Sequence, residues 1–379
     1  MKESKRSQGV RWEVVSGVLA FLLLTMSCLY FVQLAKNSPE SVPSTSTAAA
    51  VSQPDKDEKD SLSLWTENAP LKKELKDYIS RITDKDSKDY IPVKNRIAVF
   101  DFDGTLFCET DPVYFDYRLF YHRVTEDPDY KDKASAYEKE TAAKIKTMMD
   151  TGTAAKGLET DHGKGVASAF KGMTLSEFEK YVKEFRAKQA PSYNNMANGE
   201  AYYRPMLQVI KYLKANSFTV YVISGTDRLI VRGLVDNSLL DLPASQVIGS
   251  DETLVADHQG SEDGLTYQFT KDDKVITGGE FVVKNLKMNK VSVIEKEIGV
   301  QPVLSFGNSS GDNSMANFTI TNNPYPAKAF MLCCDDLTRE NGNLEKAEKM
   351  RKSCEENGWM PISMKDDWTT IYGENVTKK

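Results

Sequence analysis

Histidine and cysteine are scarce in this chain, which has three histidines and five cysteines among 379 residues. No group of them has the spacing of a zinc site, so a zinc hydrolase is not expected. Positive charge is also in deficit, because 49 Lys and Arg stand against 55 Asp and Glu and give a net charge of −6. This balance argues against a general nucleic-acid binder. With 40% hydrophobic and 27% charged residues, the composition is that of a folded protein with a real core.

Charge is absent altogether from the 22 residues Val14 to Ala35, which are almost all apolar. At about 1.5 Å of rise per residue, a helix of this length crosses a bilayer. After Lys36, no Lys or Arg occurs before Lys56. The basic residues that precede the run are Lys2, Lys5, Arg6 and Arg11. The positive-inside rule therefore predicts a cytoplasmic N-terminus and a remainder that lies outside the cytoplasm.

A cleavable signal peptide is the alternative interpretation of this run, and it would give a secreted protein. The apolar part of a signal peptide usually has about 7–15 residues and ends in small residues. The present run is longer and ends in FVQLAKN, a poor cleavage site, so an uncleaved anchor is favoured. The polar stretch after it is typical of a flexible tether. We expect this order of segments: a cytoplasmic N-terminus 1–13, an anchor 14–35, a linker 36–62, and a folded part from residue 63 to residue 379.

Four cysteines follow the anchor: Cys108, Cys333, Cys334 and Cys354. Outside the cytoplasm they could form disulfides, because that environment is oxidising. The sequence leaves their pairing open.

Three carboxylates fall within nine residues in the segment NRIAVFDFDGTLFCETDP. Ile97 to Phe100 is short, apolar and bounded by polar residues, which predicts a buried strand. Asp101 and Asp103 follow it directly; they would repel each other and be desolvated together, so a cation or a bound ligand is expected beside them. A simple Asp-Gly turn is the alternative. Gly104 and Thr105 follow the two acids, so four particular residue types stand directly behind a strand. This combination favours a catalytic site over a simple turn.

Two further strands are predicted to end in polar loops. Strand 218–223 ends in Ser224 and Gly225, which could bind a phosphate oxygen, although Ser224 could instead cap the next helix. Strand 302–306 ends in the glycine-rich loop Gly307 to Asp312. Ligands bind at the carboxyl ends of strands in open α/β sheets, so these ends predict one site for a metal and a phosphate.

Lys290 is predicted at the N-terminus of a short helix, an unfavourable place for a cation unless an anion joins it. Lys287 is the alternative for the same role. The remaining pattern alternates helix and strand and predicts an α/β fold with helices covering a parallel sheet. The other expected elements are helices 135–150, 174–189, 206–217 and 343–358, strand 329–334, an irregular segment 151–172, and a hairpin of strands 265–270 and 274–277 around an exposed acidic turn. His162 and Lys164, in the irregular segment, are expected either to touch substrate or to be solvated.

The four polar segments resemble the motifs of the haloacid dehalogenase superfamily of phosphohydrolases. Asp101 to Thr105 matches the first motif, Ser224 the second, Lys290 the third, and Gly307 to Asp312 the fourth. The resemblance spans roughly residues 96–368. It is nearest to the branch that contains phosphoserine phosphatase, with a helical cap between the first two motifs, and extends to bacterial members of unassigned substrate. It implies a Rossmann-like three-layer sandwich with a parallel sheet, in which residues 63–112 and 201–379 form the catalytic core and residues 113–200 an inserted helical cap.

The resemblance also implies roles. Asp101 would be the nucleophile that forms an aspartyl-phosphate, and Asp103 the acid and then the base. The phosphate would be bound by Thr105, Ser224, Gly225 and Lys290, and Mg²⁺ by Asp101, Asp103, Asn308 and Asp312. Most relatives carry Asp at the position of Asn308, so one negative charge is lost here and a lower metal affinity is expected.

The sequence therefore predicts a Mg²⁺-dependent phosphomonoester hydrolase, bound to a membrane and acting on a small phosphorylated substrate outside the cytoplasm. Glu109 and Arg204 are predicted either to bind a polar group of the substrate or to form a surface ion pair. A phosphotransferase or mutase with the same intermediate is an alternative, as is a non-catalytic phosphate-binding module in which Asn308 has abolished metal binding. Asp103 favours a hydrolase, because ion-pumping relatives carry Thr there and preserve the phosphoenzyme.

Overall fold

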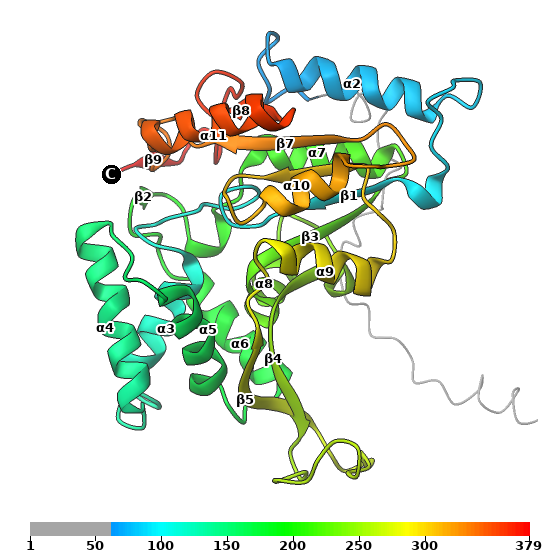
Figure 1. Ribbon diagram of the computed structural model, residues 1–379. Coiled ribbons are helices and arrows are strands. Elements are labelled where there is room, and N and C mark those ends of the chain that lie inside the picture. The colour runs from blue at the N-terminus through cyan, green and yellow to red at the C-terminus, as the bar shows by residue number, and fades with distance from the viewer. Residues whose placement is uncertain (1–61) are drawn as a thin grey trace, which may run out of the picture. The chain divides into compact units, whose positions relative to one another are not determined.

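The computed structural model of the chain describes residues 62–379, and a seven-stranded sheet lies at their centre (Figure 1). The strands follow one another across it in the order β5-β4-β3-β1-β6-β7-β8. Their bounds are β1 Ile97–Phe100, β3 Thr219–Asp227, β4 Val247–Ala256, β5 Val275–Val283, β6 Leu304–Gly307, β7 Lys328–Cys333 and β8 Met360–Ser363. All neighbours pair in parallel except β4 and β5. The predicted α/β class with a mostly parallel central sheet is confirmed.

Helices connect the strands and cover both faces of the sheet. The main helices are α2 Pro70–Thr83, α3 Phe115–Thr125, α4 Ala136–Thr151, α5 Leu158–Ala169, α6 Leu175–Arg186, α7 Arg204–Ala215, α8 Arg228–Val235, α9 Met288–Val293, α10 Asn313–Ile320 and α11 Leu344–Asn357. The π-helical turn η4, Ile294–Ile298, continues α9. A small second sheet pairs β2, Tyr193–Asn194, with β9, Thr377–Lys378, near the C-terminus.

The central strands are buried on both faces, which explains their continuous apolar runs. In β1, Ile97 and Val99 pack with residues of η4 and α10, and Ala98 and Phe100 belong to the larger core that includes α2 and α7. Phe100 lies in register with Phe306 of β6, and their stacked ring centroids are 4.3 Å apart. This packing fixes how β1 and β6 end relative to each other, and both strands end at the site described below.

The predicted cap contains α3, α4, α5 and α6, which gather beside the long hairpin of β4 and β5 (Figure 1). Backbone hydrogen bonds join the two parts: Gly172 N donates to Thr277 O, and Thr277 N donates to Met173 O, both at 2.9 Å. The Phe281 ring lies where a Cβ on Gly163 would stand, so a larger residue at that position would have to displace the ring for α5 to lie as close to β5. The hairpin thus carries the cap as well as extending the sheet.

Most elements expected from the sequence are present, including β1 with the predicted bounds, α4, α6, α7, α11 and β7. Three expectations are wrong. Strand β3 does not end at residue 223 but runs to Asp227, so that Ser224 and Gly225 lie within it. Segment 151–172 is not irregular, because it contains α5. Residues 265–270 form no strand, and the hairpin is made instead by β4 and β5, which pair antiparallel.

The predicted anchor, residues 14–35, lies outside the described residues. Within residues 62–379, no helix combines the length and the apolar character that a membrane span needs. The cysteines of this part, Cys108, Cys333, Cys334 and Cys354, are all free.

Glu252 of β4 is an unusual buried acid. Its side chain is 9% exposed, and neither carboxylate oxygen has a hydrogen-bond partner within residues 62–379. Burial raises the pKa of Glu252 to about 9, with the charges of Asp227 and Asp251 adding to it. The folded state therefore holds a proton here that the unfolded chain has released above pH 4.5.

We predict that Glu252→Gln stabilises the fold at pH 8 by on the order of 2 kcal/mol, because the amide needs no proton. The raised pKa makes the wild type lose stability as the pH rises from 4.5 towards 9, and this slope should flatten in the variant. Thermal unfolding from pH 5 to pH 8 measures it, with the exposed Glu280→Gln of β5 as the matched control. Equal slopes for wild type and Glu252→Gln would contradict the assignment.

Candidate active site

The carboxyl ends of β3, β1 and β6 lie side by side at one edge of the sheet, as their parallel pairing requires. A cavity of about 480 Å³ opens there, between this edge, the cap and α11. Asp101 and Asp103 after β1, Gly225 and Thr226 in β3, and the loop from Asn308 to Asp312 after β6 all line it. The predicted convergence of three strand ends is thus present in the structure.

Lys290 joins two of these strand ends. Its ammonium nitrogen lies 2.5 Å from Asp101 Oδ1 and 2.6 Å from Asp312 Oδ1, and the side chain is fully buried. Burial alone would lower the Lys290 pKa, but the carboxylates of Asp101 and Asp312 outweigh it and leave the pKa raised. Lys287, the alternative lysine, is exposed at the cavity. The geometry brings Lys290, and not Lys287, onto the catalytic carboxylates.

The two acids after β1 have different surroundings. Burial raises the pKa of Asp101 to about 7, the charge of Asp312 adds to this, and Lys290 opposes it. Burial also raises the pKa of Asp103 well above its ordinary value, and the charges of Asp116 and Asp101 act in the same direction. Asp101 has the lysine as counter-ion, whereas Asp103 receives a hydrogen bond of 2.7 Å from the Thr226 hydroxyl. One acid is held by a cation and its neighbour by a neutral group, an arrangement that separates their protonation states.

The loop after β6 is organised around Asp312. Its Oδ2 accepts hydrogen bonds from the backbone N–H groups of Asn308 and Ser309, at 3.1 and 3.0 Å, and its Oδ1 receives Lys290. Gly104 approaches the loop from the other side with φ of +79°, and a Cβ there would overlap the Asn308 amide. The first and fourth motifs therefore touch through a glycine that no other residue could replace without strain.

The donor set of the cavity fits a magnesium ion. Asn308 Oδ1 is buried and has no hydrogen-bond partner among the described residues, and the carboxylates of Asp101 and Asp103 line the same cavity. Mg²⁺ prefers such hard oxygen ligands. Both oxygens of Asp312 already accept hydrogen bonds, so Asp312 is better placed to act through water than as a direct ligand.

The remaining predicted phosphate-binding residues divide between the cavity and the layer behind it. Gly225 lines the cavity. Thr105 and Ser224 are fully buried: the Thr105 hydroxyl lies 3.5 Å from Asp101 Oδ2, and Ser224 Oγ accepts a hydrogen bond from Thr226 N. The helix after β3 is capped by Asp227 and not by Ser224, so the capping alternative for Ser224 is wrong.

Glu109 and Arg204 have different positions. Glu109 lines the cavity, where it accepts a hydrogen bond from the Tyr114 hydroxyl and forms an ion pair with Lys346. Arg204 does not line the cavity; it begins α7, and its Nε donates to Tyr372 O at 3.1 Å. Proximity in sequence to the second motif was misleading for Arg204, because α7 leads away from the site before β3 returns to it.

His162 and Lys164 both lie on α5 and not in a loop. His162 is buried, with Nε2 3.2 Å from Asp116 O, so the solvated alternative is wrong for it. Burial lowers the pKa of His162 to about 4 against the pull of Asp116. Lys164 is exposed, as a solvated lysine would be.

The sequence reasoning missed much of the cavity lining, and Thr226 and Asp116 are the missed residues that contact the catalytic acids or one another. Thr226 Oγ1 lies 2.7 Å from Asp103 Oδ2 and 3.2 Å from Asp116 Oδ2, and so links the core to the cap. A second hydroxyl two residues after Ser224 was a usable signal for Thr226. Asp116 gave none, because an acid in the first turn of a helix is ordinary.

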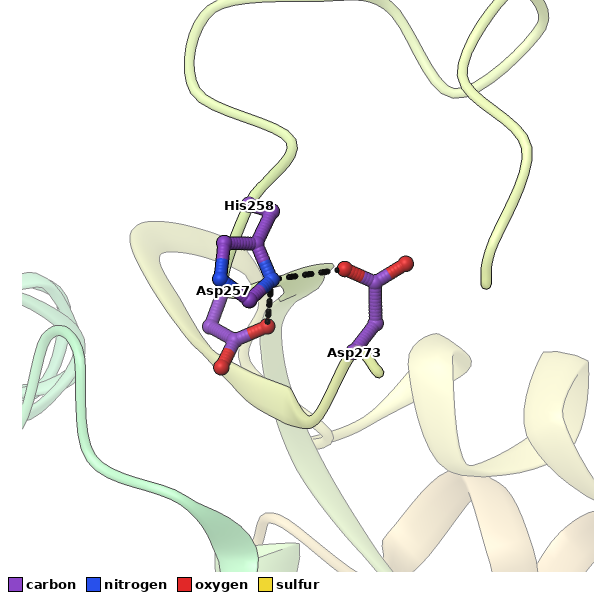
Figure 2. Close-up of side chains that lie close together, drawn as sticks. All are labelled: Asp257, His258 and Asp273. Atoms are coloured by element: carbon purple, nitrogen blue, oxygen red, sulfur yellow. Dashed lines mark hydrogen bonds and ion pairs between the residues drawn. The ribbon is translucent and has the colours of Figure 1, made fainter. Parts of the chain in front are cut away.

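A second polar cluster lies on the loop between β4 and β5 (Figure 2). His258 Nδ1 is 3.0 Å from Asp257 Oδ1 and 2.9 Å from Asp273 Oδ1. The hydrogen bond to Asp273 and the charge of Asp257 raise the His258 pKa, which favours an imidazolium between two carboxylates. Two ion pairs account for this cluster. Of the acidic turn that was expected to be exposed, Asp272 is exposed, but the Asp273 side chain is only 1% exposed.

Comparison with known proteins identifies the family. The model of the haloacid dehalogenase-like hydrolases matches residues 98–317, more than half of the chain. The chain therefore belongs to this family, as its motifs predict. The expected enzyme class, a phosphatase of the haloacid dehalogenase type, is confirmed at the level of the family.

Several solved structures are similar to this chain. One is a conserved protein of unknown function from Anaerococcus prevotii, 13% identical, covering 77% of this chain and 91% of its own, with a TM-score of 0.46. Another is cytosolic 5'-nucleotidase IIIB bound to cytidine, at 12% identity, 78% and 87% coverage and a TM-score of 0.46. A third is a phosphoserine phosphohydrolase-like protein from Francisella tularensis, at 14% identity, 67% and 92% coverage and a TM-score of 0.36. No curated protein matches the sequence.

We predict that Lys290→Met lowers phosphatase turnover about 100-fold or more, because two buried carboxylates lose their counter-ion. Stability should also fall, by about 3–5 kcal/mol. Adding Asp101→Asn to this variant should restore part of the stability but no activity. Steady-state kinetics and thermal melting measure both effects, with the exposed Lys296→Met as the control.

Lys287→Met provides the decisive comparison. If Lys287→Met is inactive while Lys290→Met retains turnover, the third motif has been assigned to the wrong lysine.

Proposed function

We propose that the chain is a Mg²⁺-dependent phosphomonoester hydrolase that acts through a phosphorylated Asp101. The observation that carries the proposal is the buried contact of Lys290 with Asp101 and Asp312, beside a second carboxylate at the end of a parallel sheet. A lysine paired this way lowers the Asp101 pKa against the larger effect of burial, and so favours the ionised carboxylate that can act as a nucleophile.

In the first step, an oxygen of Asp101 attacks phosphorus in line and the bond from phosphorus to the ester oxygen breaks. Asp103 gives its proton to the departing alkoxide, and the alcohol leaves. In the second step, a water molecule loses a proton to Asp103 and attacks the phosphorus of the aspartyl-phosphate, which releases inorganic phosphate and regenerates both acids. The raised pKa of Asp103, which burial and the charges of Asp116 and Asp101 cause against the opposing hydrogen bond from Thr226, suits Asp103 to hold a proton before the first step.

Asp101, Asp103 and Asn308 would hold the metal ion, with Asp312 acting through water. Bound Mg²⁺ would offset negative charge on the phosphoryl oxygens and orient them for in-line attack. Lys290 supplies a second positive charge, and the backbone N–H groups of the loop after β6 supply hydrogen-bond donors.

The substrate is proposed to be small, because the cap closes one side of a cavity of about 480 Å³. We also propose that the enzyme acts outside the cytoplasm. That part of the proposal rests on the uncharged run 14–35 and the basic residues before it, which lie outside the described residues.

We predict that the full-length chain releases phosphate from p-nitrophenyl phosphate in the presence of Mg²⁺ and that EDTA abolishes this turnover. Asp101→Asn should be inactive at every Mg²⁺ concentration while melting at or above the wild-type temperature, because it removes a buried charge and keeps the shape. The exposed cap variant Glu140→Gln serves as the control. A folded wild-type chain that releases no phosphate at any metal concentration would contradict the proposal and favour a binding module.

A further inference from the structure

The cavity has walls of different character. Its floor is the catalytic edge of the sheet, and α11 contributes a wall with Lys346 and Lys349. The opposite wall comes from the cap: Tyr114, Asp116 and Tyr117 at the start of α3, and Glu159 of α5. Among the lining residues that the structure places, those from the cap include two carboxylates and two phenol rings but no lysine or arginine.

Asp116 is the distinctive residue of the cap wall. Its side chain is 2% exposed, and its Oδ2 receives the Thr226 hydroxyl at 3.2 Å. Its Oδ1 is buried and has no hydrogen-bond partner within residues 62–379. A buried carboxylate oxygen without a donor is costly unless a ligand supplies one.

Within residues 62–379, no lysine or arginine forms an ion pair with Asp116 or Glu159 of this wall. His162, 3.7 Å from Asp116 Oδ2, has its pKa lowered to about 4 by burial and is neutral near pH 7. Across the cavity, Lys346 is paired with Glu109 and Lys349 with Glu345. Lys284 lies close enough to the catalytic acids to lower the Asp103 pKa by its charge, against the larger effect of burial.

The two tyrosines add a second kind of attraction for positive charge. Their ring centroids are 5.5 Å apart with planes tilted by 59°, and both rings line the cavity together with Asp116 and Glu159. The Tyr117 ring also packs against His162, with the ring centroids 4.1 Å apart. Aromatic faces next to carboxylates bind ammonium groups through cation–π and ionic attraction.

We propose that the cap wall formed by Tyr114, Asp116, Tyr117 and Glu159 binds an alkylammonium group on the alcohol part of the substrate. The substrate class is then the phosphate monoester of an amino alcohol, with its phosphoryl group at Asp101 and its ammonium group against the cap. This inference rests on the proposed function, since the same cavity must hold both ends of the ester.

The test compares charged esters with their uncharged isosteres on the full-length chain with Mg²⁺. The probes form two pairs. The first pair is phosphocholine and an ester in which a tert-butyl group replaces the trimethylammonium group, and the second pair is phosphoethanolamine and propyl phosphate. We expect kcat/KM for at least one charged ester to exceed that of its isostere about tenfold or more. A preference within the first pair points to a quaternary ammonium group, and one within the second pair to a primary ammonium group.

Variants separate charge recognition from structural damage. Asp116→Asn should reduce the charged-to-uncharged ratio about tenfold, and Glu159→Gln should reduce it less, because Glu159 is exposed. Glu159→Gln also keeps the test valid if Asp116→Asn fails to fold. The cap control Glu140→Gln should leave the ratio unchanged.

A wild-type ratio near one for both pairs, with p-nitrophenyl phosphate still hydrolysed, would overturn the inference and leave the proposed function standing. Ratios that stay high in both cap variants would also overturn it, because recognition would then lie elsewhere. Failure to hydrolyse any ester, including p-nitrophenyl phosphate, would remove the proposed function and this inference with it.

Discussion

The buried ammonium group of Lys290, held between Asp101 and Asp312, is the interaction on which the site depends. It brings a positive charge to the point where two carboxylates from different strand ends meet. Taking three charges out of water is expensive, and the cost is offset only when the geometry satisfies all of them. Asp312 meets that condition through its bonds to the loop backbone, so the lysine also fixes the loop after β6. A buried lysine between two carboxylates is therefore better explained by a role in catalysis than by a contribution to the stability of the fold.

The cap and the hairpin of β4 and β5 determine what can reach this centre. The hairpin leaves the sheet and binds the segment after α5 through Thr277, while Gly163 lets α5 lie directly on Phe281. On the inner side of the cap, Asp116 reaches Thr226 and through it the acid Asp103. A single chain of contacts therefore connects the hairpin, the cap wall and the catalytic acids. Movement of the cap would change the surroundings of Asp103 as well as access to the cavity.

The sequence was most informative where one local pattern dictates one structure. A short apolar run followed by Asp-Phe-Asp-Gly predicted β1 and its two acids correctly, and the end of β6 was predicted to within one residue, whereas β3 runs past its predicted end to Asp227. Segment 158–169 was misread because Gly163 and Gly165 resemble helix breakers. In the fold, both glycines are explained by close packing, against the rings of Phe281 and Phe120 respectively.

Residues that depend on tertiary contact were beyond this kind of reasoning. Asp116 belongs to the site only because α3 lies against the end of β3, and Arg204 is excluded from it because α7 leads away. Neither fact has a local signature. The cap wall is a property of the assembled cavity, so the specificity of the enzyme is the part of the account that needed the structure most.

The central claim is that Asp101 becomes phosphorylated during turnover. The most direct measurement is acid quenching of the full-length chain within one turnover of a phosphate ester, followed by peptide mass spectrometry. The account predicts one added phosphoryl group on the peptide that contains Asp101, absent from Asp101→Asn and lost on standing in neutral buffer. An active enzyme that never carries this phosphoryl group would contradict the account, because water would then attack the phosphate ester directly in a single step.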